Sequence, residues 1–335
     1  MPGLWGSAMR RRRFLAGAAA ATTMGVTWPF AARAQGGKIP KIGFLGTGSA
    51  TAFAVRVEGL RQGLRDLGYE EGRTAAIDFR WAEGRYERLP ELAAELVRAK
   101  ADVIVTHSTP ASLAAKQATA TIPIVMALIG DPVAAGVVAS VAKPGGNITG
   151  QSFFNAELRV KRIELLKETM PRLAKVAVIL NTGNQAGETE FQAMTVAAKA
   201  LHVQLLPFRL RSPGELPEAL QQVKAAAEAI ETGDDQIALG QIDALTAEAA
   251  KARLLSIGPE EVPRAGGMMG YGVDSVATYR HAAWYVDKIL KGAAPADLPI
   301  ERAAKFQFIL NLKAAKALGI EVPAATLLRA DEVIE

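Results

Sequence analysis

Small hydroxyl and amide residues follow three of the strands that the sequence predicts, and each group opens a predicted helix. Ser49 follows the first strand, Ser108 and Thr109 follow the third, and Asn181 follows the first strand of the second half. Such residues cap helices by accepting hydrogen bonds from the free N–H groups of the first turn. A helix N-terminus with a hydroxyl also binds a carboxylate. Several of these groups in one cleft therefore predict a small anionic or zwitterionic ligand, with capping alone as the alternative for each residue.

Three further residues are candidates for binding an ammonium group and for stacking. Asp131 follows the fourth predicted strand, where it either caps the next helix or neutralises a ligand ammonium. Tyr271 ends a late strand and is a candidate for stacking on a ligand. Asp274 stands at the start of a long helix, where it either caps that helix or binds the ligand. The predicted ligand-binding residues are Ser49, Ser108, Thr109, Asp131, Asn181, Tyr271 and Asp274.

Signatures of catalysis and of metal or nucleotide binding are weak. The chain has no cysteine, which excludes disulfides, thiolate nucleophiles and cysteine metal sites. His107, His202 and His281 lie in separate segments without metal-binding spacing, and of the three His107 is placed to line a cleft. The Gly46-Thr47-Gly48 turn lacks the third glycine of the dinucleotide fingerprint, whose position holds Thr51. No catalytic residue, metal or cofactor is expected; an exported nicotinamide-dependent oxidoreductase is the alternative to a binding protein.

Short strands and amphipathic helices must position these residues. Apolar β-branched runs alternate with amphipathic runs, which is typical of βαβ units around a parallel sheet. In the first half we expect strands at 41–45, 75–80, 103–106, 122–127 and 147–150, and helices at about 51–67, 86–99, 110–118 and 132–141. In the second half we expect strands at 176–180, 204–208, 254–257, 267–271 and 306–310, and helices at about 156–169, 187–201, 214–230, 241–252, 274–291 and 312–318.

The two halves of the chain begin alike. Lys41 and Lys175 each open an apolar strand that is followed by a helix, and Leu67-Gly68-Tyr69 and Leu201-His202-Val203 stand at the same offset after them. The sequence therefore predicts an α/β fold of two similar lobes in tandem with parallel sheets, with chance likeness of two βαβ openings as the alternative. Because ligands bind beyond the carboxyl ends of strands in open α/β sheets, the loops of both lobes should line one cleft.

The predicted lobes are discontinuous in sequence. We place the first lobe at 38–150, with about 274–298 returning to it, and the second at 151–273, with about 304–335 returning to it. The glycine-rich segment 145–150 falls where the chain first crosses between them. Its small residues suit a hinge.

The N-terminal segment has the features of an export signal. Arg11-Arg12-Arg13-Phe14-Leu15 precedes a short apolar run that ends at Ala32-Arg33-Ala34, a small-x-small cleavage site. The run is too short to span a bilayer. The paired arginines resemble the twin-arginine class of signal, with ordinary Sec export as the alternative. We expect residues 1–34 to be cleaved near Ala34, leaving a periplasmic protein without a membrane anchor.

The positive charge of the chain belongs to this segment. The sequence has 39 Lys and Arg and 34 Asp and Glu, for a net charge of +5, and the predicted signal holds five arginines and no acidic residue. The remaining chain is therefore balanced in charge, and no nucleic-acid partner is expected. Its length and its 50% hydrophobic content exceed one ordinary core and indicate two domains.

Several segments, taken in combination, resemble the tryptophan/tyrosine-type ABC transporter substrate-binding protein family. The resemblance covers essentially the whole chain after the signal. It implies a type I periplasmic-binding-protein fold of two Rossmann-like lobes with hinge crossovers and a small-molecule ligand closed between them. It also implies an inner-membrane ABC permease and ATPase as partners. The segments are 80–92, 101–105, 121–125, 130–133, 143–150, 285–292 and 327–334.

Two segments depart from the family pattern. Glu231–Gln236 stands where the family has an apolar strand, and Pro259–Pro263 stands where it has an aromatic-rich segment. We therefore expect the periplasmic solute-binding component of an ABC importer for a small polar or zwitterionic solute, with amino acids among the candidates. A sensory module that acts on a membrane receptor is a further alternative.

Overall fold

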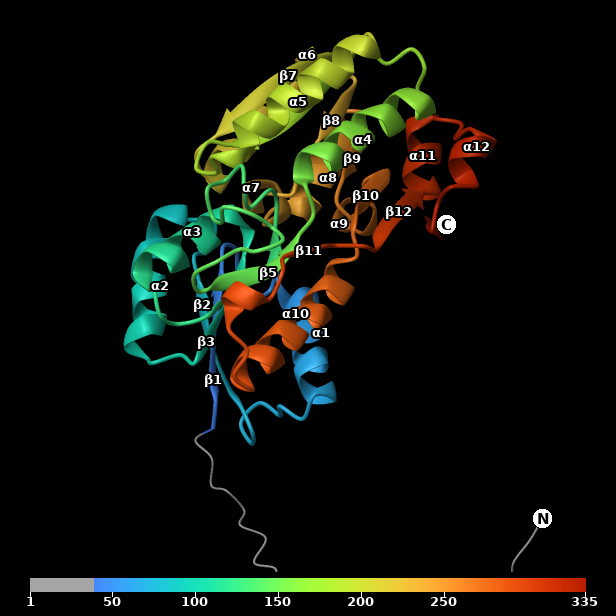
Figure 1. Ribbon diagram of the computed structural model, residues 1–335. Helices are drawn as coiled ribbons and strands as arrows, with labels where there is room; N and C mark the ends of the chain where they lie inside the picture. Colours follow the sequence, from blue (N-terminus) through green and yellow to red (C-terminus); the bar gives the residue numbers. More distant parts are fainter. Residues whose placement is uncertain (1–38) are drawn as a thin grey trace, which may run out of the picture. The chain divides into compact units, whose positions relative to one another are not determined.

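The computed structural model describes residues 39–335, which form one compact unit from Ile39 to Glu335 (Figure 1). The predicted signal and its cleavage site at Ala34 lie outside the described residues. Within residues 39–335, no helix combines the length and apolar character that a membrane span requires.

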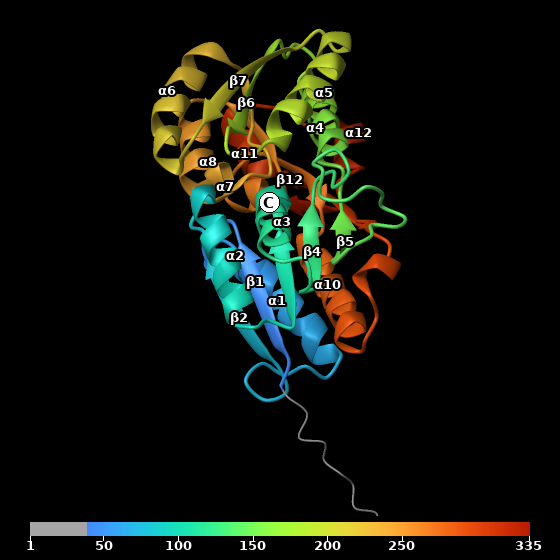
Figure 2. The same ribbon diagram turned by 60° about the vertical axis from the view of Figure 1, so that its left-hand side comes forward.

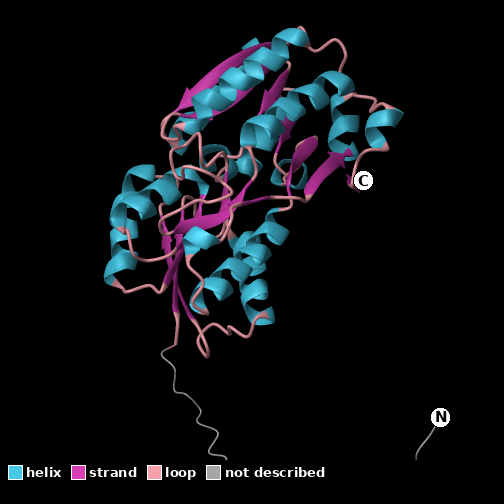
Figure 3. Cartoon of the chain, viewed as in Figure 1, coloured by secondary structure: helices cyan, strands magenta, loops and turns pink. Residues whose placement is uncertain are grey.

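The strands form two sheets with helices packed on them (Figure 3), which confirms the predicted α/β fold of two mostly parallel sheets. The strand order is β11-β5-β4-β3-β1-β2 in the first sheet and β13-β12-β10-β9-β8-β6-β7 in the second. All pairs in the first sheet are parallel. In the second sheet the pair of β10 with β12 is antiparallel.

The first lobe consists of the six-stranded sheet and its helices. Its strands are β1 (Lys41–Gly46), β2 (Ala76–Trp81), β3 (Val103–His107), β4 (Ile124–Ile129), β5 (Ile148–Ser152) and β11 (Glu301–Arg302). Its helices are α1 (Ala54–Asp66), α2 (Leu89–Arg98), α3 (Ser108–Ala118) and α10 (Ser275–Leu290). Alternation along β1 fills both faces of the sheet: Ile42 and Phe44 pack into the core under α1 and α10, and Leu45 packs into the core under α2 and α3.

The second lobe consists of the seven-stranded sheet and its helices. Its strands are β6 (Lys175–Asn181), β7 (Gln204–Leu210), β8 (Ala229–Glu231), β9 (Leu255–Gly258), β10 (Met269–Val273), β12 (Phe306–Asn311) and β13 (Glu332–Ile334). Its helices are α4 (Asn155–Thr169), α5 (Ala186–Ala200), α6 (Leu216–Ala226), α7 (Gln236–Leu239), α8 (Ile242–Lys251), α9 (Glu261–Arg264), α11 (Leu312–Leu318) and α12 (Ala324–Leu327).

The chain passes between the sheets after β5, between β10 and α10, and between β11 and β12. Helix α10 follows a strand of the second sheet but packs against α1 and β4 of the first, and Figures 1 and 2 both show α1 and α10 side by side. A Cβ atom on Gly63 of α1 would lie 2.3 Å from the carbonyl oxygen of Arg280, so glycine is required for this close approach.

Asp274 links two of these passages. Its side chain caps α10 by accepting a hydrogen bond from the Ala277 N–H at 2.9 Å, and its carboxylate pairs with Lys305 Nζ at 2.6 Å. Its N–H donates to the carbonyl of Lys305 at 3.0 Å. The start of α10 is therefore fixed to the connection that follows β11.

One predicted helix is wrong, and a second is wrong at its C-terminal end. Residues 132–141 form turns rather than a helix, and Gly136 adopts a positive φ of 68° that ends the turn Asp131 begins. The helix predicted at 214–230 ends at Ala226, and residues 229–231 form β8 in the middle of the second sheet. The strand predicted at 267–271 lies two residues later, as β10.

Candidate ligand-binding cleft

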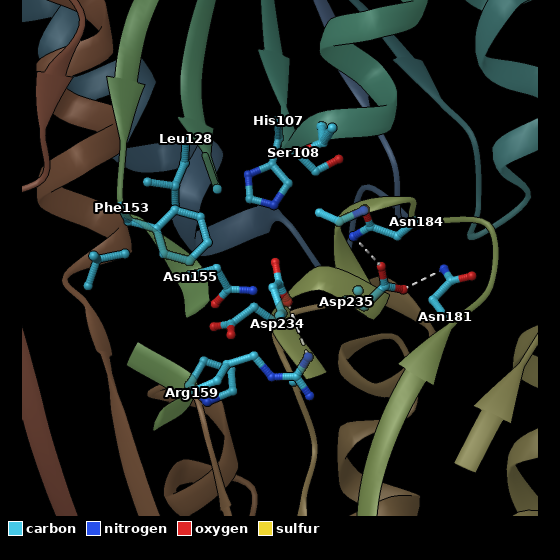
Figure 4. Close-up of a pocket in the computed structure, with 18 of the residues that line it drawn as sticks. His107, Ser108, Leu128, Phe153, Asn155, Arg159, Asn181, Asn184, Asp234 and Asp235 are labelled. Atoms are coloured by element: carbon cyan, nitrogen blue, oxygen red, sulfur yellow. Dashed lines mark hydrogen bonds and ion pairs between the residues drawn. The ribbon is translucent and has the colours of Figure 1, made fainter. Parts of the chain in front are cut away.

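A cavity lies where the ends of β3, β4 and β5 face the ends of β6, β8 and β10 (Figure 4). Such a position, beyond the carboxyl ends of strands and between two α/β layers, is where ligands bind in folds of this class. The first lobe supplies what we call the first wall: Arg56, His107, Ser108, Thr109, Leu128, Gly130 and Phe153. The second lobe supplies the second wall, which includes Asn155, Arg159, Ile179, Asn181, Asn184, Glu190, Asp234, Asp235, Glu260 and Glu261.

The step from β3 to α3 gives the first wall its polar groups. Ser108 begins α3 with a positive φ of 72°, a conformation that costs a non-glycine residue about 1–3 kcal/mol. Its Oγ is buried and has no hydrogen-bond partner among residues 39–335. Thr109, only 5% exposed, follows it in the cavity lining. Figure 4 shows Ser108 beside His107 at this edge of the cavity.

Apolar side chains line the adjoining part of the cavity. Leu128 lies near the end of β4 and Phe153 follows β5, and Figure 4 shows the two close together near the His107 ring. Val273 and Ile179 add aliphatic surface from the second sheet. The next residue after Phe153, Phe154, has a left-handed φ of 49° at the N-cap of α4. This apolar surface suits a hydrophobic portion of a ligand.

A buried network of charged groups supports the second wall. Arg159, 3% exposed, donates from Nη1 to Glu190 at 3.1 Å and from Nε to Glu231 at 3.2 Å. Arg162 makes a bidentate pair with Asp234 at 2.7 and 2.8 Å and donates to Glu231 at 3.1 Å. Glu231, fully buried in β8, therefore lies between two guanidinium groups that compensate its charge.

Glu190 and Asn155 bring acceptor groups to the cavity from this network. Burial raises the pKa of Glu190, and the Arg159 guanidinium opposes that shift. The neighbouring Asn155 side chain also lowers the pKa of Glu190. Asn155 is 8% exposed, and its Oδ1 has no hydrogen-bond partner among the residues that the structure describes. A carboxylate and a free carbonyl oxygen side by side suit an ammonium donor.

Side-chain contacts also join the two lobes beside the cavity. Tyr86, in the turn before α2, donates from Oη to Asp235 at 3.0 Å. Asp235 also accepts from Asn181 Nδ2 at 2.6 Å and from Asn184 Nδ2 at 3.2 Å (Figure 4). Arg56 of α1 forms an ion pair with Glu261 of α9. Since these contacts span the two lobes, they favour the arrangement in which the cavity is covered on both sides.

Of the seven residues predicted from the sequence, the cavity lining contains Ser108, Thr109 and Asn181. The amide of Asn181 is already used: Nδ2 donates to Asp235, and Oδ1 accepts from the Gly183 N–H at 2.8 Å. Asn181 therefore acts on the cavity by fixing the loop and Asp235.

The other four predicted residues lie outside this lining. Ser49 Oγ accepts from the Ala52 N–H at 3.2 Å and caps the turn before α1. Asp131 accepts from two N–H groups of the following turn and lines a neighbouring depression. The ring of Tyr271 packs on Phe306 and Phe308, with centroids 6.4 Å away in each case, and Asp274 caps α10. For each of the four, local structure accounts for the residue type.

The charged residues of the cavity were not predicted from the sequence. Arg159 and Arg162 stand three residues apart on α4 and face the same carboxylate, Glu231. No local signal marked them, because Glu228 and Glu231 stand in a stretch with a helical pattern and the partners of Glu231 lie far away in the chain. Only its burial shows that Glu231 requires a buried partner.

Comparison with known proteins gives the family. The model of the family "ABC transporter substrate binding protein" matches residues 42–334. The chain is 27% identical over 266 residues to a tyrosine-binding protein of Clostridioides difficile (strain R20291), covering 79% of this chain and 76% of that protein.

Solved structures agree with this match. A conserved domain protein of Vibrio cholerae has a TM-score of 0.84 at 28% identity, over 88% of this chain and all of that one. An ABC domain from Streptococcus pneumoniae in complex with L-Trp has a TM-score of 0.83 at 25% identity, over 89% of this chain and all of that one. Membership implies a small-molecule ligand and a membrane ABC transporter as partners. The chain belongs to the ABC transporter substrate-binding protein family and has the type I periplasmic-binding-protein fold.

Proposed function

We propose that this protein is the periplasmic solute-binding component of an ABC importer and that it binds an L-amino acid with an apolar side chain in the cleft, without catalysis. One observation carries the proposal: each wall presents a buried polar atom without a protein partner, Ser108 Oγ and Asn155 Oδ1. A buried unpaired polar atom costs about 1–3 kcal/mol. A ligand that pairs with both atoms contacts both lobes at once, and such differential binding favours the closed form.

The charges of the lining favour a ligand ammonium group. Five carboxylates line the cavity against two guanidinium groups. Asp235 accepts hydrogen bonds from Asn181 and Tyr86, and Glu261 pairs with Arg56. We assign the ammonium group to Glu190, which adjoins the unpartnered Asn155 Oδ1, and to that oxygen, although Glu190 also pairs with Arg159. The ligand carboxylate is assigned to Ser108 Oγ and the N-terminal turn of α3.

The apolar surface then takes the side chain of the amino acid. Leu128, Phe153 and Val273 lie together at one side of the cavity. The relatives support this assignment, because one is named for tyrosine binding and another was solved with L-Trp. Tryptophan and tyrosine are accordingly the first compounds to test.

The experiment compares ligands that differ by one charge. The chain without residues 1–34 is unfolded, dialysed and refolded to remove retained ligand, and thermal shifts are measured with L-tryptophan, L-tyrosine and L-leucine. A ligand present at 100 times its Kd stabilises the folded form by about 2.7 kcal/mol. Tryptamine, which lacks the carboxylate, and indole-3-propionate, which lacks the ammonium group, should each bind at least about 10-fold more weakly than L-tryptophan.

The variants Ser108→Ala and Asn155→Leu should weaken binding of L-tryptophan. Val196→Ala is the control, because this side chain is 73% exposed on α5 and does not line the cavity. Equal binding of L-tryptophan and both one-charge analogues, or no binding of any amino acid, would contradict the proposed function.

A further inference from the structure

His107 and Tyr279 form a buried pair behind the first wall. His107, at the end of β3, is 7% exposed, and Tyr279 of α10 is fully buried. Tyr279 Oη lies 2.7 Å from His107 Nδ1. The ring of Phe53 meets the imidazole edge to face at 4.9 Å, so packing as well as the hydrogen bond fixes the ring.

The hydrogen bond determines which imidazole nitrogen carries the proton. Tyr279 Oη has no other hydrogen-bond partner among residues 39–335, so a proton on Nδ1 would leave the phenol hydrogen buried without an acceptor. That arrangement costs about 1–3 kcal/mol. The phenol therefore donates to Nδ1, and the ring proton of the neutral imidazole lies on Nε2.

The surroundings keep both groups neutral. Burial raises the pKa of Tyr279, and burial together with the nearby Arg56 guanidinium lowers the pKa of His107 well below its usual value. The charged groups that face the pair are Arg56 of α1 and, from the segment that forms α9, Glu260 and Glu261. Arg56 pairs with Glu261, and Glu260 accepts a hydrogen bond from Ser275. Among residues 39–335 neither carboxylate hydrogen-bonds the imidazole.

The remaining nitrogen, Nε2, has no hydrogen-bond partner in the described part of the chain, and His107 lines the cavity. Figure 4 shows the imidazole beside Phe153 at the edge that also holds Ser108. We propose that His107 is a specificity residue: Tyr279 fixes it as an Nε2–H donor that binds a carboxylate oxygen of the ligand beside Ser108. This inference rests on the proposed function for the identity of the ligand. Tyr279 is a positioning residue.

Nitrogen NMR on the ligand-free protein tests the tautomer without any ligand. In protein labelled with ¹⁵N-histidine, His107 is assigned by the signal that His107→Gln removes, and we expect a protonated Nε2 and an unprotonated Nδ1. The signals should stay those of the neutral ring between about pH 5.5 and 8. His281, whose side chain is 41% exposed and pairs with Glu301, is the internal comparison.

Matched variants test whether the ligand carboxylate accepts a hydrogen bond from His107 Nε2. A glutamine side chain places an N–H near the position of Nε2, whereas asparagine places it near Nδ1. His107→Gln should therefore keep the affinity for L-tryptophan within about 3-fold, and His107→Asn and Tyr279→Phe should lower it by about 5–10-fold. Tryptamine, which lacks the carboxylate, should bind all four proteins alike.

The outcomes separate this inference from the proposed function. A proton on Nδ1 overturns the inference, as does wild-type affinity for L-tryptophan in both His107→Asn and Tyr279→Phe. If no amino acid binds, the proposed function fails. The NMR result on the free protein then shows by itself whether His107 Nε2 carries the proton.

Discussion

The two walls of the cleft are built on different principles. The first wall is largely neutral: His107, Ser108 and Thr109 bring single polar atoms, one of them on a strained backbone. The second wall is charged, but its charges are mostly matched within the second lobe by Arg159 and Arg162. The second wall is therefore a platform whose charges the protein largely matches itself, with Asn155 Oδ1 unpartnered, whereas in the first wall Ser108 Oγ and His107 Nε2 have no partner among residues 39–335. Strained residues and unpaired polar atoms are typical of such binding surfaces.

The largest expected effect tests whether the platform depends on its buried charges. Glu231→Gln leaves Arg159 and Arg162 without the fully buried carboxylate between them. We expect the free energy of unfolding to fall by about 3–5 kcal/mol in urea denaturation, the usual result of breaking a buried pair. Glu188→Gln breaks the exposed pair with Arg209 and should cost no more than about 1 kcal/mol. Equal small losses in both variants would show that the platform does not need its central charge.

The next effect concerns the group that the platform presents to the ligand. Glu190→Gln keeps an acceptor for Arg159 but removes the charge assigned to the ligand ammonium. Affinity for L-tryptophan, measured by calorimetry, should fall by about 10–100-fold, the range for a hydrogen bond to a charged group. Indole-3-propionate, which has no ammonium group, should bind the variant no more weakly than it binds the wild type. A parallel loss for both compounds would contradict the assignment.

The first wall should differ from the second in its response to pH. Because burial lowers the pKa of His107 in the folded state, the unfolded chain takes up a proton below about pH 6.5 that the folded chain does not. Wild-type stability should therefore fall, relative to His107→Gln, by up to about 1.4 kcal/mol per pH unit as the pH drops below that value. The difference between the two proteins cancels the contributions of Glu190 and Glu260. A constant difference from pH 8 to 5 would refute a buried neutral imidazole.

The smallest effect separates strain from binding at Ser108. Both Ser108→Gly and Ser108→Ala remove the unpaired hydroxyl, but only glycine also relieves the positive φ, so the free energy of unfolding of Ser108→Gly should exceed that of Ser108→Ala by about 1 kcal/mol. Both variants lose the hydroxyl and should weaken L-tryptophan binding by about 5–10-fold. Chemical denaturation and calorimetry on the pair check this. A glycine variant less stable than the alanine variant would show that the conformation carries no strain.

The regular elements could be predicted because local patterns determine them. Strands β1 to β5 follow short runs rich in apolar and β-branched residues, and the helices α1, α2 and α3 follow amphipathic runs with a period of 3.6 residues. The pattern fails at β8, where Glu231 stands in the core. The sequence from Ala227 to Glu231 continues a helical pattern, and only its pairing with Arg159 and Arg162, far away in the chain, makes a strand possible there.

The site could be predicted where it depends on the start of a helix. Ser108 and Thr109 follow a strand and precede Pro110, a local signal that placed them in the cleft. The charged wall could not be predicted in the same way, because burial and pairing of Glu190 and Asp234 depend on contacts between distant segments. Tyr271 is a residue that a local signal misplaced. Its position near a strand end suggested stacking on a ligand, but its ring packs against Phe306 and Phe308 of the next strand.

The position of α10 has a consequence for biosynthesis. The first 152 residues contain five of the six strands of the first sheet, but α10, which covers α1, ends only at Leu290, and the edge strand β11 follows at Glu301–Arg302. The second sheet is likewise incomplete until β12 and β13 have been synthesised, and β13 ends at Ile334. Domains usually mature one after another as they leave the ribosome. Here both halves remain unfinished until almost all of the polypeptide has been translated, and they should then reach the native state together.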